Sequence, residues 1–585
     1  MRSLPHLRRL LPYLERHRTG LLGGLACLAA TTAFSVANPW VLRHAIDDLA
    51  LQVTRQKLWL YAGLIMGLIV LEGVFRYYMR MVLIGMSREI EYELRNDLFR
   101  HFTRLPARYY QENRIGDLMS RATNDMSAVR MVIGPGIMYT ANTVATFVGA
   151  VSLMLVISPR LTLLALVPLA LVSILVRHYG RRIHDRFEEV QAQLSNINAL
   201  VQENLAGARV VRAYAQEAHE EASFDEANQE YVERNRRVIR LTGILYPGIQ
   251  FLMGLGVVTV LWLGGAMVVR GTITLGEFVA FGVYLAMLSW PMIALGWVVN
   301  LFERGEASMG RINALLDAPT EIRDDEPLAV PEIRGDVEFR HLTFAYRETT
   351  VLHDIDLRVP AGTTVAVVGP TGSGKSTLVS LIPRLYEAPP GTVLVDGHDV
   401  RRISLGALRG AVGFVPQETF LFSDTVEGNI AFGVPGEPAT DSVRRRVSWA
   451  SGIAQLAKDV EDFPRGYDTF VGERGITLSG GQKQRAAIAR ALAVDPRILV
   501  LDDALASVDT ETEEEILKGL REVMRSRTTF LVSHRVSTVR EADLIVVLRE
   551  GRIVERGTHE ELVAEGGFYA DLHRRQLLEA EMETA

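Results

Sequence analysis

The chain has 585 residues, of which 48% are hydrophobic and 23% charged, and its net charge is −6. At about 150 residues per domain, this length predicts two to four folding units. The composition excludes a disordered chain, and the negative net charge argues against a nucleic-acid partner bound through bulk positive charge. The single cysteine, Cys27, excludes an intrachain disulfide and a cysteine-based zinc site.

Six apolar stretches before residue 310 approach the length of a membrane helix. About 20 mostly apolar residues cross the roughly 30 Å of hydrocarbon in a bilayer. We therefore expect a transmembrane domain over residues 19–312, preceded by an amphipathic interfacial helix in residues 1–18. The alternative for 1–18 is the cytoplasmic end of the first helix. The six stretches are 20–41, 58–82, 132–157, 161–176, 241–269 and 275–301.

Two of the connections between these stretches are long, polar and rich in arginine. They cover residues 83–131 and 177–240. Positive charge favours the cytoplasm, so both segments and both chain ends are expected inside a cell inner (cytoplasmic) membrane. About 25 helical residues beyond the bilayer would project roughly 35–40 Å. Breaks at 108–116 and 207–214 predict a short helix across the tip of each hairpin, where aromatic and arginine side chains meet a partner domain; an ordinary solvated hairpin is the alternative.

The second half has the alternating pattern of an α/β domain. Pro327 and Pro331 mark a linker over 313–334, strand-like and helical stretches alternate over 335–575, and 576–585 form a tail. A phosphate-binding loop follows the apolar run 365–368. Its glycines let backbone N–H groups wrap phosphates, while Lys375 neutralises the β- and γ-phosphates and Ser376 offers an oxygen to Mg²⁺. The loop residues that we expect to contact ATP are Gly369, Thr371, Gly372, Ser373, Gly374, Lys375, Ser376 and Thr377.

A second apolar strand, 498–501, ends at Asp502. A carboxylate at the end of a core strand beside a phosphate-binding loop suits Mg²⁺, directly or through water. The alternative is an aspartate in an ordinary strand-end turn. A nucleoside triphosphate and Mg²⁺ are therefore the predicted cofactors, and the family resemblance described next implies that the nucleotide is ATP.

Leu478, Ser479, Gly480, Gly481 and Gln482 match the signature motif of the ATP-binding cassette family without deviation. With six membrane segments followed by one cassette, the chain resembles the exporter half-transporters of that family over nearly its whole length. The resemblance implies a type IV exporter fold, in which a six-helix membrane domain with long cytoplasmic extensions is fused to an α/β nucleotide-binding domain. It also implies an ATPase coupled to transport, and it makes the two hairpin tips resemble coupling helices.

The resemblance assigns further residues one by one. Tyr346 sits where an aromatic ring stacks on adenine, Gln417 where a glutamine contacts Mg²⁺ and the membrane domain, and His534 where a switch histidine contacts the γ-phosphate. Asp509 matches an aspartate that communicates across the dimer, and Glu473 lies in a loop that touches the coupling helices. Each residue also has a simpler interpretation. The alternatives are a core tyrosine at Tyr346, a surface amide at Gln417, a packed strand-end histidine at His534, a helix cap at Asp509 and a solvated turn charge at Glu473.

One residue departs from the family pattern. The family usually has glutamate directly after the strand-end aspartate, but this chain has Asp503. Aspartate reaches roughly 1.5 Å less far toward the attacking water, and about 1 Å of misplacement costs on the order of a hundredfold in rate. In this family two cassettes pair head to tail, so each ATP lies between one phosphate-binding loop and the signature of the other chain. Asp503 beside an intact signature favours the weak-site member of a heterodimer; a homodimer with two slow sites is the alternative.

The expected function is ATP-driven export of amphipathic small molecules, such as drugs, lipids or peptides, by alternating access. The expected partners are a second half-transporter, membrane lipid and the amphipathic substrate. A homodimeric exporter or lipid flippase is the first alternative, and a channel or regulator built on the same fold is another. The fused membrane segments argue against a soluble cassette ATPase, and the fused order argues against an importer.

Overall fold

The computed structural model describes residues 4–325, 327–328, 332–436, 440–472, 475 and 477–584. The chain forms two compact units. One comprises Met1–Phe102 and Ile115–Ala318, and the other comprises Thr103–Arg114 and Pro319–Ala585. The tip of the first cytoplasmic hairpin thus belongs to the nucleotide-binding unit.

Six apolar helical segments of the described chain are long enough to cross a membrane, which confirms the expected transmembrane domain. They are longer than the apolar stretches alone. The helix α8, for example, has 48 residues, and at 1.5 Å per residue it is about 72 Å long, more than twice the hydrocarbon thickness. The segments are α2 (Arg18–Leu51), α3 (Arg55–Phe102), α5 to α7 (Ile115–Ser120, Met126–Met131 and Ile137–Ile157), α8 (Pro159–Ala206), α10 and α11 (Glu217–Thr259 and Gly265–Val269), and α12 and α13 (Leu275–Met287 and Ser289–Leu316).

Three single π-helical turns interrupt these segments: Arg121–Asp125, Val132–Gly136 and Val260–Gly264. The second contains Pro135, which removes a backbone donor and its helical hydrogen bond. A π-helical turn accommodates this proline without ending the helix. The interruptions therefore do not divide the membrane segments.

A short helical stretch, η1 (His6–Leu10) and α1 (Leu11–Arg16), precedes α2. The carboxylate of Glu306 accepts hydrogen bonds from the backbone N–H groups of His6 (2.9 Å) and Leu7 (3.1 Å). Leu10 is buried, whereas Leu11 is 53% exposed. The N-terminal stretch is thus fastened to α13 and keeps an exposed apolar side chain.

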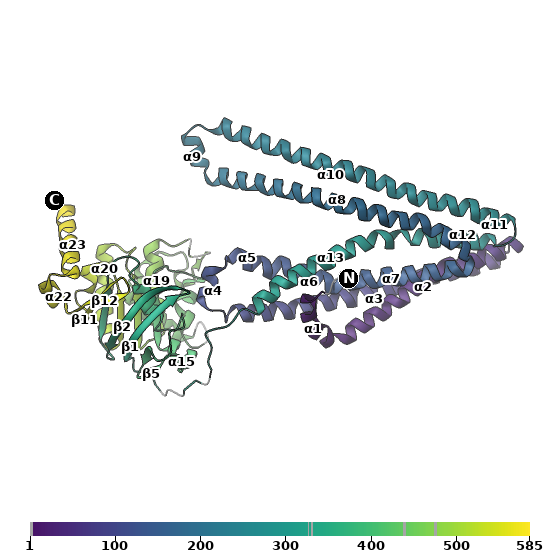
Figure 1. Ribbon diagram of the computed structural model, residues 1–585. Helices are drawn as coiled ribbons and strands as arrows, with labels where there is room; N and C mark the ends of the chain where they lie inside the picture. Colours follow the sequence, from purple (N-terminus) through teal and green to yellow (C-terminus); the bar gives the residue numbers. More distant parts are fainter. Residues whose placement is uncertain are drawn as a thin grey trace. The chain divides into compact units, whose positions relative to one another are not determined.

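The helices α8 and α10 run side by side and are joined by α9 (Ala208–Ala213) (Figure 1). Asn204 donates to the Glu220 carboxylate (2.7 Å) close to the tip. Gln193 donates to the carbonyl of Ala227 (2.9 Å) further along the hairpin. The first hairpin tip carries α4 (Ala107–Glu112). Both short tip helices lie where the sequence predicts them.

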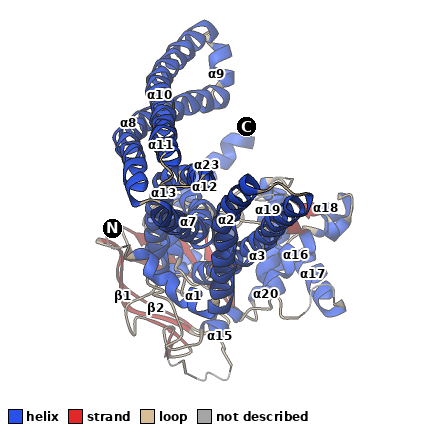
Figure 2. Ribbon diagram, turned by 90° about the vertical axis from the view of Figure 1, so that its right-hand side faces the viewer, coloured by secondary structure: helices blue, strands red, loops and turns tan. Residues whose placement is uncertain are grey.

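The nucleotide-binding unit is built on a six-stranded sheet of order β12-β11-β3-β10-β9-β6, in which only the edge strand β12 is antiparallel. Strands β1 and β2 of a second sheet pair side by side (Figure 2). Strands β3, β9 and β10 are buried at every position, as parallel strands covered on both faces require. A four-stranded antiparallel sheet, β2-β1-β4-β5, and a two-stranded one, β7-β8, complete the unit. The strands are β1 (Val337–Tyr346), β2 (Thr349–Val359), β3 (Thr364–Val368), β4 (Val393–Val395), β5 (His398–Asp399), β6 (Val412–Val415), β7 (Asp424–Thr425), β8 (Phe470–Val471), β9 (Ile498–Asp502), β10 (Thr528–Val532), β11 (Leu544–Arg549) and β12 (Arg552–Gly557).

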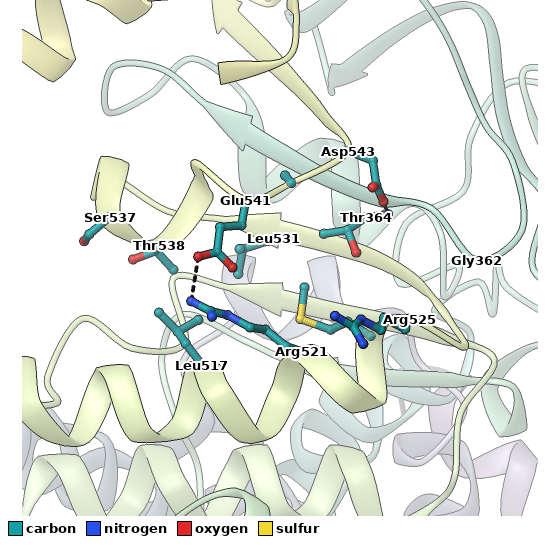
Figure 3. A pocket seen from close by; sticks show the side chains of 12 residues that line it. Gly362, Thr364, Leu517, Arg521, Arg525, Leu531, Ser537, Thr538, Glu541 and Asp543 are labelled. Carbon is teal, nitrogen blue, oxygen red and sulfur yellow. Dashed lines mark hydrogen bonds and ion pairs between the residues drawn. The ribbon is translucent and has the colours of Figure 1, made fainter. Parts of the chain in front are cut away.

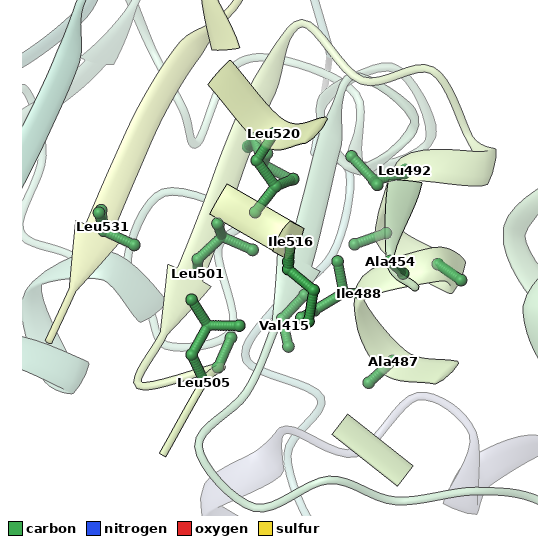
Figure 4. Packing of buried hydrophobic residues seen from close by; sticks show 14 of the residues in the cluster. Val415, Ala454, Ala487, Ile488, Leu492, Leu501, Leu505, Ile516, Leu520 and Leu531 are labelled. Carbon is green, nitrogen blue, oxygen red and sulfur yellow. The ribbon is translucent and has the colours of Figure 1, made fainter. Parts of the chain in front are cut away.

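Alternate residues of the central strands belong to two different hydrophobic clusters. Leu501 and Leu531 pack with Ile488, Ile516 and Leu520 on one face (Figure 4). The residues one position earlier, Val500 and Phe530, belong to the cluster that includes β1 and β2. This is the period-2 alternation of a strand between two layers. The helices of the unit are α14 (Lys375–Ser380), α15 (Leu405–Gly410), α16 (Val426–Ile430), α17 (Asp441–Ile453), α18 (Ala457–Asp462), α19 (Gly480–Ala493), α20 (Thr510–Met524), α21 (Val536–Val539), α22 (His559–Glu565) and α23 (Phe568–Thr584).

Two predicted boundaries differ from the structure. The helix α13 continues to Leu316, so the first residues of the predicted linker, 313–334, are helical. The predicted tail, 576–585, is largely part of α23, which runs to Thr584. The tail is helical because Tyr569 and Leu572 pack on the core and hold the start of the helix. No glycine or proline follows Gly567 to end it.

Candidate nucleotide site

Residues from four segments at one edge of the central sheet, together with Val351 of β2, line a cavity of about 220 Å³. The segments follow β3, β6, β9 and β10, which are parallel, so their carboxyl ends meet at the same edge. The structure therefore brings together the phosphate-binding loop, Gln417, the strand-end aspartates and the switch histidine. The lining residues are Thr371, Gly372, Gly374, Lys375, Ser376, Thr377, Gln417, Asp502, Asp503 and His534, with Val351 and Val532.

Two glycines of the loop are required by its backbone. Gly369 has φ +149° and Gly374 has φ +99°, conformations that side chains rarely adopt. A Cβ on Gly369 would lie 2.0 Å from the carbonyl oxygen of Leu548. The loop therefore approaches β11 as closely as only glycine allows.

The loop has polar groups suited to a phosphate. The Lys375 ammonium donates to the carbonyls of Gly369 and Pro370, both at 2.9 Å, and burial lowers its pKa. The Ser373 hydroxyl is buried and has no hydrogen-bond partner among the described residues. A buried hydroxyl without a partner is costly, and a phosphate oxygen would satisfy it. These residues fit the triphosphate of ATP.

The oxygen ligands expected for Mg²⁺ also meet in this cavity. Ser376 Oγ donates to Asp502 Oδ1 at 3.0 Å, and Gln417 lines the same space. Asp502 is only 4% exposed, and its burial raises the pKa of its carboxyl. Hydroxyl, carboxylate and amide oxygens are the hard ligands that Mg²⁺ prefers, so the set fits the ion.

Asp503 has a left-handed backbone, with φ +49°, and its N–H donates to the carbonyl of Val532 at 2.9 Å. Aspartate tolerates this conformation better than most residues. The His534 side chain is exposed toward the same cavity. Partial burial and the Lys375 charge lower the His534 pKa.

Tyr346 lies beside this cavity. Its hydroxyl donates to Thr377 Oγ1 at 3.3 Å, and Thr377 lines the cavity. The Tyr346 ring stands edge-on to Tyr386, with ring centres 5.1 Å apart. The ring is only half-buried, which leaves apolar surface available.

The signature residues are not part of this cavity. Ser479 and Gln482 form a reciprocal cap on α19: Ser479 Oγ accepts from the Gln482 N–H (3.2 Å), and Gln482 Oε1 accepts from the Ser479 N–H (3.0 Å). Gly480 and Gly481 lie next to Ser507. Among the described residues, none of these four lines the cavity, so a single chain leaves its phosphate-binding loop without a signature.

Asp509 caps α20 by accepting a hydrogen bond from the Thr512 N–H at 2.9 Å. The hydrogen bond from Thr512 lowers the pKa of this carboxyl. The cap agrees with the simpler interpretation of Asp509 and does not test a role across a dimer. Glu473, with Arg474, falls outside the described residues.

Sequence reasoning missed the polar contacts of α4 in the nucleotide-binding unit. Glu112 accepts hydrogen bonds from Arg347 (2.8 Å) and Arg108 (2.7 Å), and these two guanidinium groups lower its pKa to about 2. Gln111 donates to the Tyr386 hydroxyl at 2.7 Å. Tyr386 and Arg347 flank the Tyr346 region, and no sequence motif marks either residue.

A second cavity, of about 360 Å³, lies at the opposite edge of the sheet (Figure 3). Thr364, the first residue of β3, lines it, whereas the phosphate-binding loop follows the last residue of β3. Arg521 and Glu541 form an ion pair of 2.7 Å within it. The residues predicted to bind ATP do not line this second cavity.

A membrane domain of six helices on the same chain as this nucleotide site defines an ATP-driven membrane transporter. Two family models match the chain: the ABC transporter transmembrane region over residues 21–292 and the ABC transporter family over residues 352–506. The probable multidrug resistance ABC transporter ATP-binding/permease protein YheI of Bacillus subtilis (strain 168) is 39% identical over 95% of this chain and 94% of its own length.

Other relatives agree. The multidrug resistance-like ATP-binding protein MdlA of Escherichia coli (strain K12) is 36% identical over 98% of this chain and 97% of its own. The ATP-dependent lipid A-core flippase of Syntrophus aciditrophicus (strain SB) is 34% identical over 98% of this chain and 94% of its own. The solved structure of a bacterial Atm1-family ABC exporter with ATP bound superposes with a TM-score of 0.79 at 29% identity, covering 96% of this chain and 99% of that one.

The chain belongs to the ATP-binding cassette transporter family. It has the type IV exporter fold, it is a multi-pass membrane protein with a cytoplasmic nucleotide-binding domain, and it is a transport ATPase. These findings confirm the expected family, fold class, membrane location, ATPase activity and use of ATP.

Proposed function

We propose that this chain is one half of an exporter that moves amphipathic small molecules across the cytoplasmic membrane by alternating access. The names of its relatives support this class of substrate, since they include multidrug resistance proteins and a lipid A-core flippase. Apolar substrate surface matches the apolar membrane helices.

The ATP site needs a second subunit. The signature residues lie outside the cavity formed by the phosphate-binding loop of the same chain. In the proposed assembly, Ser479, Gly480, Gly481 and Gln482 complete the ATP site of the partner, and the partner's signature completes this one. Asp509 communicates between the two sites.

Within the site, we assign each residue a role from its position. Thr371, Gly372, Gly374 and Lys375, which line the cavity, bind the phosphates together with Gly369 and Ser373 of the same loop. Thr377 and Tyr346 adjoin the nucleoside, and His534 contacts the γ-phosphate. Ser376, Asp502 and Gln417 would hold Mg²⁺. When bound, Mg²⁺ supplies positive charge that stabilises the reacting phosphates. Asp503 orients the attacking water.

The single observation that carries the asymmetric assembly is the presence of Asp503 in the cavity. Its carboxylate reaches roughly 1.5 Å less far than a glutamate, which costs on the order of a hundredfold in rate. The intact signature on the same chain would serve a competent partner. A heterodimer with one weak and one strong site therefore explains both features.

A homodimer with two slow sites, working as an exporter or lipid flippase, is the second candidate. It is favoured by His534, which lines the same cavity as Asp503 and keeps the site equipped for hydrolysis. The two assemblies predict different subunit compositions.

The two tip helices are proposed to couple ATP hydrolysis to transport. The helix α4 is held by the Glu112–Arg347 and Gln111–Tyr386 contacts in the nucleotide-binding unit. At α9, Val210 is 60% exposed and Tyr214, next to the helix end, is 74% exposed. Exposed apolar side chains of this kind suit a docking contact with the partner subunit.

Purification from the native membrane, followed by mass spectrometry of the intact complex, tests the assembly. A stoichiometric second cassette chain with glutamate at the position of Asp503 is the expected result. Replacing that glutamate with glutamine should then abolish ATP hydrolysis by the complex. A complex that contains only this chain and hydrolyses ATP would overturn the heterodimer and leave the symmetric pump.

A further inference from the structure

The loop that carries His534 is fastened from two sides. On one side, the buried carboxylate of Glu513 in α20 accepts a hydrogen bond from Thr538 Oγ1 (2.6 Å) and pairs with Arg535. On the other side, the side chain of Gln576 in α23 reaches the same loop. The first contact joins the loop to the helix that Asp509 caps, whereas the second joins it to the end of the chain.

Gln576 uses both ends of its amide on the backbone around His534. Its Nε2 donates to the carbonyl of His534 at 2.6 Å, and its Oε1 accepts from the N–H of Val536 at 2.8 Å. A carboxamide is suited to this bridge because one planar group contains a donor and an acceptor. The two bonds hold backbone groups on both sides of Arg535.

The position of Gln576 is fixed by the packing of α23. The carboxylate of Glu555 accepts hydrogen bonds from the N–H groups of Phe568 (2.6 Å) and Tyr569 (3.1 Å) at the start of this helix. Tyr569 is fully buried, and Leu572 packs on the same cluster. Tyr569, Leu572 and Gln576 are spaced i, i+3 and i+7, so they lie on one face of the helix. The amide is thus presented by a fixed helix.

We propose that Gln576 is a positioning residue of the nucleotide site: its amide sets the backbone of His534 so that the imidazole faces the γ-phosphate. This inference rests on the proposed role of His534 in contacting that phosphate. It gives the C-terminal helix a part in telling ATP from ADP, which differ only in the γ-phosphate. Without the amide, the His534 carbonyl and the Val536 N–H lose their partners and the loop can turn.

Photolabelling through the adenine ring, which the proposed site places beside Tyr346, reports mainly on the ATP bound by the phosphate-binding loop of this chain. The purified transporter complex is irradiated on ice with 8-azido-ATP in the presence of increasing concentrations of ATP or of ADP, and the covalent label on this chain is measured. The ratio of the two displacing concentrations gives the preference for ATP. Gln576→Met keeps the size of the side chain and removes both hydrogen bonds. Arg575→Met is the matched control, because Arg575 is exposed on the same helix.

We expect Gln576→Met to lower the preference for ATP over ADP about fivefold, the effect of losing one ordinary hydrogen bond. Arg575→Met should leave the preference unchanged. His534→Ala should lower it at least as much as Gln576→Met. The melting temperature of each variant shows whether the domain remains folded.

A second variant separates positioning from folding. The ionised carboxylate of Gln576→Glu accepts from Val536 but repels the His534 carbonyl, whereas the protonated acid donates to it. Relative to the native chain at each pH, the ATP preference of Gln576→Glu should therefore recover as the pH falls from about 7 to about 4, through the usual glutamate pKa of about 4.3. Gln576→Met should show no such recovery. A purely structural role of α23 would lower the melting temperature without a pH-dependent recovery of ATP preference.

Three results would overturn the inference, and they differ. If Gln576→Met matches Arg575→Met while His534→Ala loses ATP preference, the role of Gln576 is wrong and that of His534 stands. If His534→Ala also keeps the preference, the proposed role of His534 falls, and the inference falls with it. Failure of Gln576→Glu to recover at low pH would likewise contradict a backbone clamp.

Discussion

Relative to the native chain, Asp502→Asn should raise the stability of the nucleotide-free protein and lower the stability of the ATP-bound protein. Asp502 is 4% exposed, and its burial raises the pKa of the carboxyl. A raised carboxyl pKa means that the folded chain binds a proton more tightly than the unfolded chain. Stability is therefore lost as the pH rises from the ordinary aspartate pKa to the raised pKa of the folded chain. At neutral pH the buried charge is a cost that asparagine does not have.

The size of the effect follows from burial. Leaving a buried polar group imperfectly compensated costs about 1–3 kcal/mol, and asparagine keeps an oxygen to accept from Ser376. For a folding unit of about 150–250 residues, 1 kcal/mol shifts the melting temperature by about 2–4 °C. Asp502→Asn should therefore raise the melting temperature in EDTA without nucleotide by several degrees.

Binding of ATP with Mg²⁺ should reverse the order of stability of the native chain and Asp502→Asn. A ligand present at about one hundred times its Kd stabilises the folded state by about 2.7 kcal/mol. The native chain should gain this with ATP and Mg²⁺, and Asp502→Asn should gain much less, because it lacks the carboxylate proposed to hold the ion. Differential scanning fluorimetry in EDTA and in Mg-ATP measures the melting temperatures of both proteins under the two conditions. A lower melting temperature of Asp502→Asn in EDTA, or equal stabilisation of both chains by Mg-ATP, would refute the reasoning.

Two further predictions concern contacts around the site. Tyr346→Phe loses the hydroxyl, which bonds Thr377, but keeps the ring, and should weaken ATP binding by less than about 1 kcal/mol. Tyr346→Ala also loses the ring and should weaken binding more. Equal Kd values for the two variants would contradict an adenine contact. Arg347 and Arg108 lower the Glu112 pKa to about 2. The ion pairs therefore persist at all pH values above that, and the stability that they add is lost only as the pH falls through about 2. Glu112→Gln should reduce the stimulation of ATPase by substrate to the same extent at about pH 6 and about pH 8; a reduction confined to one pH would contradict this.

The nucleotide motifs were predictable from sequence because their chemistry is local. The run 369–377 carries its own glycines, lysine and hydroxyls, and its backbone requires the glycines at Gly369 and Gly374. The six membrane helices were predictable because length and apolarity alone define them. Their ends were less predictable, since the cytoplasmic extensions are polar and α13 continues past the expected boundary.

The contacts that sequence reasoning missed join residues far apart in the chain. Glu112 and Arg347 are 235 positions apart, and Gln576 lies 42 positions from His534. Glu112, Arg347 and Gln576 are common residues on a helix or at a turn, and none of the three belongs to a sequence motif. The sequence predicts a tail over 576–585 because the packing of Tyr569 on the core, rather than a sequence signal, determines where the C-terminal helix lies.

The steady-state ATPase rate of the purified transporter with Asp503→Ala and with Asp503→Glu tests the central claim, that this chain contributes a weak hydrolytic site, most directly. If the partner site performs most of the turnover, Asp503→Ala should barely change the rate. Asp503→Glu restores the reach of the family residue and should raise the rate. Loss of ATPase in Asp503→Ala would contradict the account and make Asp503 the working base of a symmetric pump.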